Sequence, residues 1–141
     1  MNKLETKLSE FMKPMLLDSA TTTLDDTRQI LLATWIIKTA MVHEFTDPAR
    51  QTYFARYERR HVKRWLLPPN DVWIWIGHYI NSTSLSHTFP VYLMHGERPT
   101  VYSLTLTAGR FVCQVLAYRR RKWKGVQRLD GTSPPESSGL A

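Results

Sequence analysis

Two short segments of the chain combine basic side chains with aromatic rings, a combination that can bind the backbone and the bases of a nucleic acid. The first segment lies between Tyr57 and Trp65, and the second begins at Tyr118. Lysine and arginine neutralise phosphates, and an exposed tryptophan or tyrosine can stack on an unpaired base. The candidate nucleic-acid-binding residues are Arg56, Arg59, Arg60, Lys63, Arg64, Arg119, Arg120, Arg121, Lys122, Trp123 and Lys124.

The net charge of +7 comes from these two segments. Residues 55–66 carry five basic and one acidic side chain, and residues 111–141 carry six and two, so each contributes +4. Residues 1–54 carry six basic and seven acidic groups, and residues 67–110 carry two of each. Clustered charge of this kind favours a polyanionic partner, with an ordinary solvated surface as the alternative. The sequence has no recognition-helix or RNP motif, so sequence-specific reading of DNA or RNA bases is not implied.

The sequence contains none of the common catalytic or metal-binding motifs. It has no Gly-x-Ser-x-Gly, no Walker loop, no Gly-x-Gly-x-x-Gly and no His-Glu-x-x-His. His78 and His87 could meet across neighbouring strands, but no third ligand accompanies them at a familiar spacing. The single cysteine, Cys113, excludes a disulfide framework. We therefore predict no catalytic residue, no metal and no cofactor.

An aromatic row supports a second hypothesis. Trp73, Trp75 and Tyr79 occupy alternate positions of an apolar segment, so they would project from one side of a strand. If the helices cover only the other side of the sheet, this row is exposed and favours a protein partner or a homodimer. A sheet covered on both faces is the alternative.

A lysine within an apolar helix supports a third hypothesis. Lys38 must extend to solvent, pair with an acid or reach a binding site, and Glu44 or an acid from another element would be its partner. Trp35, Lys38 and Thr39 could instead line a small-molecule pocket between helix and sheet. A domain of this kind, with or without enzymatic activity, ranks below the other two hypotheses.

The central element that must position these residues is a helix from about Leu24 to Phe45. Its apolar residues recur at i, i+3, i+4 and i+7 and cover most of its circumference. A capping box of Thr23 and Asp26 would begin it. It is too short, and too interrupted by Lys38, to span a bilayer, which requires about 20 mainly apolar residues. Because no signal-peptide core is present, we expect a cytoplasmic protein without membrane association.

Two further helices are predicted from apolar spacing and proline positions. The first covers residues 3–12 and ends near Pro14. The other has Pro48 at its start and runs from Ala49 to Leu66, before Pro68-Pro69.

After these prolines the apolar period changes from 3.6 to 2, and β-branched and aromatic residues dominate, which indicates strands. Four strands are predicted at residues 71–80, 87–94, 100–107 and 110–118, with a polar loop at 81–86 and a tight hairpin at Ala108-Gly109. The predicted fold is therefore α+β, with about three N-terminal helices followed by an antiparallel sheet of about four strands packed on the central helix. Residues 1–129 would form one domain, and residues 130–141 a flexible tail.

Several short motifs also resemble a known group of proteins. Trp35-x-x-Lys38-Thr39-Ala40-Met41-Val42, Pro68-Pro69 and Val72-Trp73-Ile74-Trp75-Ile76-Gly77 resemble segments of uncharacterised bacterial proteins associated with HNH-type endonucleases. Met1-Asn2-Lys3-Leu4-Glu5 is similar to the end of their Met-Ser-x-Leu-Glu motif. The resemblance covers about residues 1–118.

The departure from this group concerns the catalytic part. The chain has no Cys-x-x-Cys and no metal-binding His-Asn-His, so the nuclease-like segment is missing. The resemblance therefore implies a non-catalytic companion domain encoded on a mobile element. Together with the charge distribution, it predicts an α+β domain that binds nucleic acid through the phosphate backbone.

Overall fold

Three helices and a four-stranded antiparallel sheet make up the fold. The computed structural model describes residues 3–17, 22–46, 48, 51–80 and 88–119. The helices are α1 (Lys3–Leu17), α2 (Asp26–Thr46) and α3 (Arg56–Trp65), and the strands are β1 (Val72–His78), β2 (Thr88–His95), β3 (Arg98–Ala108) and β4 (Phe111–Tyr118). The predicted α+β fold, with helices before strands, is confirmed. The predicted loop at 81–86 and the predicted tail at 130–141 lie outside the described residues.

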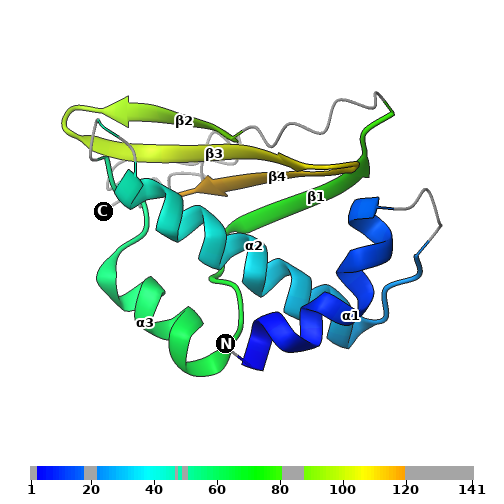
Figure 1. The fold of residues 1–141 in the computed structure, drawn as a ribbon. Coiled ribbons are helices and arrows are strands. Elements are labelled where there is room, and N and C mark those ends of the chain that lie inside the picture. The colour runs from blue at the N-terminus through cyan, green and yellow to red at the C-terminus, as the bar shows by residue number, and fades with distance from the viewer. Residues whose placement is uncertain (1–2, 18–21, 47, 49–50, 81–87, 120–141) are drawn as a thin grey trace, which may run out of the picture.

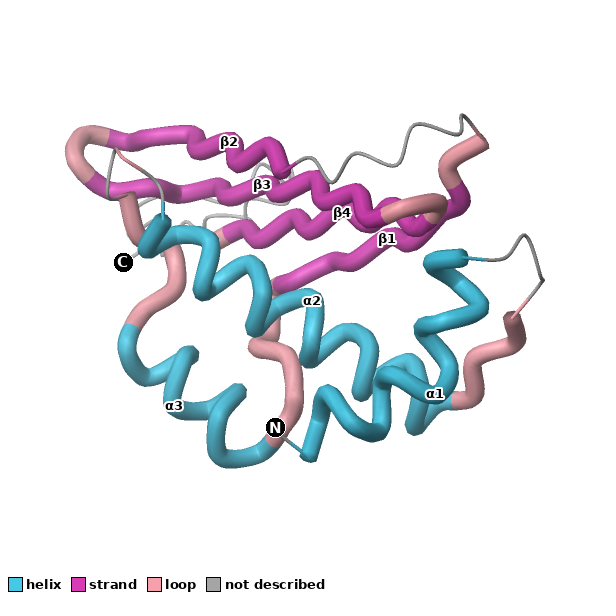
Figure 2. Tube along the Cα trace, in the orientation of Figure 1, coloured by secondary structure: helices cyan, strands magenta, loops and turns pink. Residues whose placement is uncertain are grey.

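The strands follow the order β1-β4-β3-β2 across the sheet. Two-residue turns join β2 to β3 and β3 to β4, because His95 pairs with Arg98 and Ala108 pairs with Phe111. The strand that comes first in the sequence, β1, pairs with the last, β4. All three helices lie on one side of this sheet, with α2 running beneath it and α1 and α3 flanking α2 (Figures 1 and 2).

The core lies between α2 and the sheet, as the apolar pattern of α2 predicts. Ile37 and Ala40 of α2 are fully buried, and so are Tyr102 of β3 and Val115 of β4. The Tyr102 hydroxyl donates a hydrogen bond of 3.4 Å to the Ala40 carbonyl, so even the polar end of this core ring has a partner. Leu4, Leu8, Phe11 and Met12 close the core from α1.

The prediction that α1 ends near Pro14 is wrong. The helix continues through Pro14 to Leu17, although proline cannot donate the helical hydrogen bond at that position. Packing compensates for this loss, because Met15 and Leu16 lie against the core. The Leu16 carbonyl also accepts a hydrogen bond of 3.3 Å from Arg110 N in the β3–β4 turn. Figure 1 shows α1 bending so that its last turn approaches this hairpin.

The N-terminus of α2 also differs from the prediction. Asp25, and not the pair Thr23 and Asp26, caps the helix, because the Asp25 side chain accepts a hydrogen bond of 2.8 Å from Arg28 N. The Asp25 carbonyl accepts the first helical hydrogen bond, from Gln29 N at 2.9 Å. Both candidate caps carry suitable side chains, and the sequence pattern does not choose between them.

The largest error concerns α3, which begins at Arg56 and not at Ala49. Residues 51–55 are not helical. The backbone N–H groups of Tyr53 and Phe54 donate to the side chain of Glu44, 9 and 10 residues earlier, and this bonding takes the place of a helical pattern. The start of α3 is therefore set by a contact with α2.

Two negative findings apply to the described part of the chain. There, no helix combines the length and the apolarity that a membrane span requires. The same residues include no group of three or more histidine, cysteine, aspartate or glutamate side chains arranged to hold a metal ion.

The two hairpin glycines provide a matched test of the contact between α1 and the sheet. Gly96 and Gly109 both have positive φ, 60° and 57°, so alanine at either site incurs a left-handed backbone cost of about 1–2 kcal/mol. A Cβ at Gly96 would meet nothing within 4 Å, whereas a Cβ at Gly109 would lie 2.6 Å from the Leu16 carbonyl oxygen. Urea unfolding should therefore show that Gly109→Ala lowers the free energy of unfolding by at least about 1 kcal/mol more than Gly96→Ala. Equal losses would show that α1 is not held against the turn.

Candidate nucleic-acid interface

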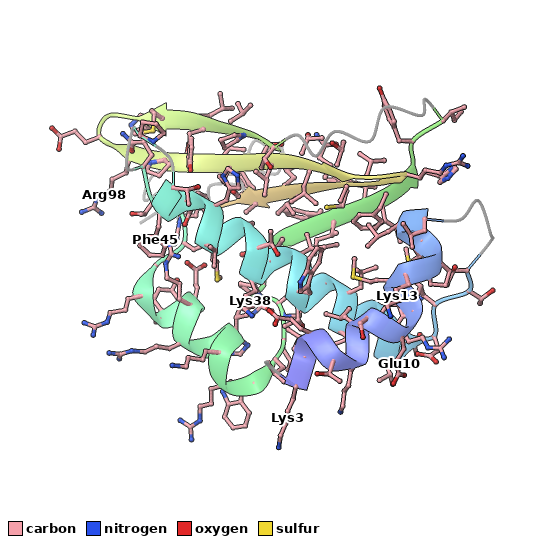
Figure 3. The ribbon with its side chains drawn as sticks, viewed as in Figure 1. Lys3, Glu10, Lys13, Lys38, Phe45 and Arg98 are labelled. Carbon is pink, nitrogen blue, oxygen red and sulfur yellow. The ribbon has the colours of Figure 1, made fainter. Side chains whose placement is uncertain are left out.

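A cavity of about 790 Å³ opens at the end of the molecule where α2 finishes, α3 begins and β2 turns into β3. We call it the basic cavity. Phe45 from α2 and Arg98 from β3 mark this end in Figure 3. The residues that line the cavity are Phe45, Thr52, Tyr53, Phe54, Ala55, Arg56, Arg59, His95, Arg98, Pro99, Thr100 and Arg119. None of these described lining residues is acidic, so the cavity is suited to an anion.

Glu44 is the group around which the cavity is built. It is 1% exposed, and its carboxylate accepts hydrogen bonds from Tyr53 N at 2.5 Å and from Phe54 N at 3.4 Å. It also forms an ion pair with Arg59 of α3. A single buried carboxylate on α2 thus fixes both the connecting segment and the next helix.

Burial raises the pKa of the Glu44 carboxyl above its usual value, and the N–H of Tyr53 and the Arg59 guanidinium act in the opposite direction. The hydrogen bonds and the ion pair thus compensate only part of the desolvation of this carboxylate. A buried ion pair of this kind contributes little net stability, but it makes the loss of either partner costly.

Arg59 is committed to the structure of the domain. Besides Glu44, its guanidinium donates to the Met41 carbonyl at 2.9 Å and to the Phe54 carbonyl at 3.2 Å. Its centre also lies 4.4 Å from the centroid of the Phe45 ring. Arg59 lines the cavity, but its charge is already compensated.

Arg119 enters the same cavity from the end of β4. It donates to the Tyr53 carbonyl at 2.6 Å and to the Glu58 carboxylate at 2.8 Å, and it lies 4.7 Å from the centroid of the Tyr53 ring. Burial is the largest single influence on Arg119 and disfavours its charge, but the Glu58 carboxylate, Tyr57 and Tyr53 together outweigh burial, so the pKa of Arg119 lies above its usual value. Burial also raises the pKa of the Tyr53 hydroxyl to about 12. The structure thus brings one residue of the C-terminal basic segment to the start of α3.

Arg56 and Arg98 differ from Arg59 and Arg119, because they are exposed and form no ion pair within the described part of the chain. They come from the first turn of α3 and the first position of β3. These two guanidinium groups are available for a ligand in the cavity.

The remaining basic residues of α3 extend the positive surface away from the cavity. Arg56, Arg60, Lys63 and Arg64 are spaced at i, i+4, i+7 and i+8, so they share one face of the helix, and all four are exposed. We call this row the α3 ridge. Because Arg56 belongs to both features, the ridge and the cavity form one continuous basic surface.

Both ends of α3 are fixed, which holds the ridge in place. At the N-terminus, the Glu58 carboxylate accepts a hydrogen bond of 2.6 Å from Ala55 N. At the C-terminus, Leu66 adopts a left-handed conformation with φ of 53°, and its carbonyl accepts a hydrogen bond of 2.8 Å from the Thr34 hydroxyl of α2.

The sequence-predicted residues therefore divide into three groups. Arg56, Arg60, Lys63 and Arg64 form the exposed ridge, and Arg59 and Arg119 are structural walls of the cavity. The others, Arg120, Arg121, Lys122, Trp123 and Lys124, lie outside the described residues.

Sequence reasoning missed His95 and Arg98, which lie between the predicted strands at residues 87–94 and 100–107. The antiparallel pairing of β3 and β4 could have indicated Arg98. This pairing places Val101 opposite Tyr118, so residues just before Val101 must lie near those just after Tyr118. Arg119 N indeed donates to the Thr100 carbonyl at 3.0 Å.

Trp35, Lys38 and Thr39, the residues predicted to form a small-molecule pocket, do not line one cavity together. Lys38 pairs at 2.9 Å with Glu5 of α1, so an acid from another element is its partner, and Glu44 is not. Lys38 lines a cavity of about 480 Å³ between the helices, away from the sheet (Figure 3). Trp35 and Thr39 are not among the residues lining it, and the Thr39 hydroxyl donates to the Trp35 carbonyl at 2.9 Å.

The aromatic row is exposed, which is the condition that the second hypothesis requires. Trp73, Trp75 and Tyr79 retain 44%, 51% and 39% of their accessible surface. Trp73 and Trp75 lie on the face of the sheet opposite to the helices, because the alternate residues Val72 and Ile74 pack against the core, and Tyr79 directly follows β1.

We found no match to this chain among protein-family models, curated proteins or solved structures. The resemblance to HNH-associated proteins stays a prediction.

The importance of the Glu44 carboxylate can be tested by Glu44→Gln, with Glu5→Gln as the matched control. Glu44→Gln removes the charge that compensates Arg59 within the core, and it should lower the free energy of unfolding by about 3 kcal/mol. Glu5→Gln removes an equivalent charge from a half-exposed ion pair and should cost less than about 1 kcal/mol. Urea unfolding measures both values. Similar small losses would show that Glu44 does not hold α2 and α3 together.

Proposed function

We propose that the basic cavity and the α3 ridge together bind the phosphate backbone of a nucleic acid. The observation that carries this proposal is the convergence of Arg56 and Arg98 on one cavity without an acidic partner among the described residues. The two residues are more than 40 positions apart in the sequence, and the fold brings them together. Exposed arginines can contact phosphate oxygens with two parallel N–H groups.

The dimensions of the α3 ridge suit a polyanion better than a single phosphate group. Arg56 and Arg64 are eight residues apart, which corresponds to about 12 Å along a helix. Phosphates on one strand of a duplex advance by about 3.4 Å each, so the ridge can follow three or four of them. Arg98 adds a further contact from the sheet layer.

Aromatic rings beside the basic surface favour a ligand with unpaired bases. Tyr57, Trp65 and Phe45 keep 67%, 58% and 68% of their accessible surface. The Arg64 guanidinium lies 4.9 Å from the centroid of the Trp65 ring, so a cation and a stacking surface are presented together. Stacking on an aromatic ring is tolerant of base identity, and phosphate contacts carry no sequence information. We therefore expect binding with little sequence preference and a preference for single strands.

The resemblance to HNH-associated proteins adds a setting for this activity. A companion domain that holds a nucleic acid by its backbone would raise the local concentration of substrate for a separate nuclease. This chain would supply the binding step, and the cleaving residues would belong to another segment or another protein.

The proposal predicts a defined salt dependence. Contacts from Arg56, Arg60, Lys63, Arg64 and Arg98 to about five phosphates give a slope near −4.5 in a plot of log affinity against log salt on duplex DNA. The double variant Arg56→Ala/Arg98→Ala should weaken binding at least about 10-fold and reduce the magnitude of this slope by about 2. Fluorescence anisotropy with labelled single- and double-stranded oligonucleotides measures both quantities.

The matched control is Lys3→Ala/Lys13→Ala, which removes the same net charge from exposed positions of α1, away from Arg98 (Figure 3). The control should change the affinity less than threefold. An equal loss in the two double variants would mean that net charge alone attracts the polyanion. A wild-type chain that binds no oligonucleotide at low salt would overturn the proposal. Arg59 and Arg119 are unsuitable for this test, because their substitution also breaks contacts within the fold.

A further inference from the structure

The described strand residues on the side of the sheet that faces away from the helices include no charged side chain. Cross-strand pairing places the following described residues on this outer face: Trp73, Trp75 and Gly77 of β1; Val91 and Leu93 of β2; Val101, Ser103, Thr105 and Thr107 of β3; and Val112, Gln114, Leu116 and Tyr118 of β4. None of them is aspartate, glutamate, lysine or arginine, in a chain with a net charge of +7. A sheet face that meets only water ordinarily carries charged side chains at such positions.

A band that is apolar except for Ser103 crosses this outer face from one edge strand to the other. Trp73 pairs with Leu116, which pairs with Ser103, which pairs with Val91. The neighbouring row contains Tyr118, Val101 and Leu93. Val91 and Leu93 keep 54% and 59% of their accessible surface, so no described element covers the band. Contiguous exposed apolar surface of this extent indicates an interface.

We propose that a second copy of this chain covers the outer face, so that two sheets pack face to face with the helices on the two outer sides. This proposal does not depend on the nucleic-acid interface, which lies on the helix side of the sheet. Paired sheets of this kind lie about 10 Å apart, with their strand directions within about 30° of each other.

The size of the outer face is sufficient for such a dimer. Four strands about 4.8 Å apart, each paired with its neighbour over seven or eight residues at about 3.4 Å per residue, cover roughly 19 by 25 Å. Side-chain relief adds to this projected area, so two faces together bury on the order of 1,000 Å² or more, which reaches the lower limit for a specific interface.

The distribution of charge favours a second copy over a different partner. Two molecules that each carry +7 repel one another over most of their surfaces. The described residues of the outer face let two copies meet without opposing charges of the same sign, because the α3 ridge lies in the helix layer and the basic cavity opens at the end of the molecule. A twofold interface is self-complementary, and a neutral apolar face satisfies this condition without any charged pair.

Sedimentation equilibrium of the full-length chain tests the proposal. A monomer has a mass of 16.5 kDa, and we expect the mass average to rise to twice this value as the concentration increases from about 1 to 500 µM. Val91→Lys and Leu116→Lys each place a charge in the band, on an edge strand and on a central strand. Each substitution should raise the dissociation constant of the dimer by about 100-fold.

The matched control is Val42→Lys on α2, because Val42 is 56% exposed, almost the same as Val91, but belongs to the helix layer. Val42→Lys should dimerise like the wild type, and circular dichroism on heating should show that all three variants fold. A dimer that survives both Val91→Lys and Leu116→Lys would overturn the proposal. A wild-type chain that stays monomeric over the whole concentration range would also overturn it.

Labelling then identifies what covers the face in such a monomer. Cys113 is 1% exposed, so a maleimide should report on an added Val91→Cys. Slow labelling that does not depend on concentration would show that residues 120–141 of the same chain cover the face. Fast labelling of the monomer would show a bare face. In the proposed dimer, labelling should instead slow down as the concentration rises.

Discussion

The fold depends on one buried carboxylate. Glu44 lies in α2, yet it determines the path of the chain at Tyr53 and Phe54, because it holds their backbone N–H groups and the guanidinium of Arg59. That path delivers the rings of Tyr53 and Phe54 to Tyr102 of the sheet, with centroid distances of 5.8 and 5.5 Å. At this end of the molecule, the polar contacts of Glu44 therefore position the aromatic contact that joins the layer of helices to the layer of strands.

The same contact decides which charges remain for a partner. Basic residues that look alike in the sequence have different roles in the structure. Arg59 and Arg119 satisfy Glu44, Glu58 and backbone carbonyls, so they build the cavity wall. Arg56 and Arg98 reach the same cavity from its rim, where solvent keeps them accessible. Acidic partners within the fold neutralise part of the positive charge, which reduces the repulsion among the basic groups that remain. A domain can thus gather many basic residues at one place.

Sequence periodicity was sufficient for the fold class and for the placement of the two tryptophans on one side of a strand, because both follow from local patterns, whereas the exposure of that side depends on where the helices pack. The change of apolar period after Pro69 separates helices from strands, and alternation in β1 places Trp73 and Trp75 on the same face. Features that depend on distant partners were not predictable in this way. The start of α3 follows from the contact with Glu44. The continuation of α1 beyond Pro14 follows from its packing on the β3–β4 turn, and the role of Arg98 follows from the register of the strands. Residue type alone also could not distinguish the structural role of Arg59 from the exposed position of Arg56, because the two arginines differ in burial.

The strand order also has a consequence for synthesis of the chain. In the order β1-β4-β3-β2, the first strand to be made pairs with the last one. About 40 residues separate the end of β1 from the end of β4, which corresponds to roughly 2 to 8 s of translation. During this interval a nascent chain holds a strand rich in tryptophan and isoleucine whose hydrogen-bonding partner does not yet exist. Such a strand is a candidate for chaperone capture on the ribosome until its pairing partner, β4, has been made.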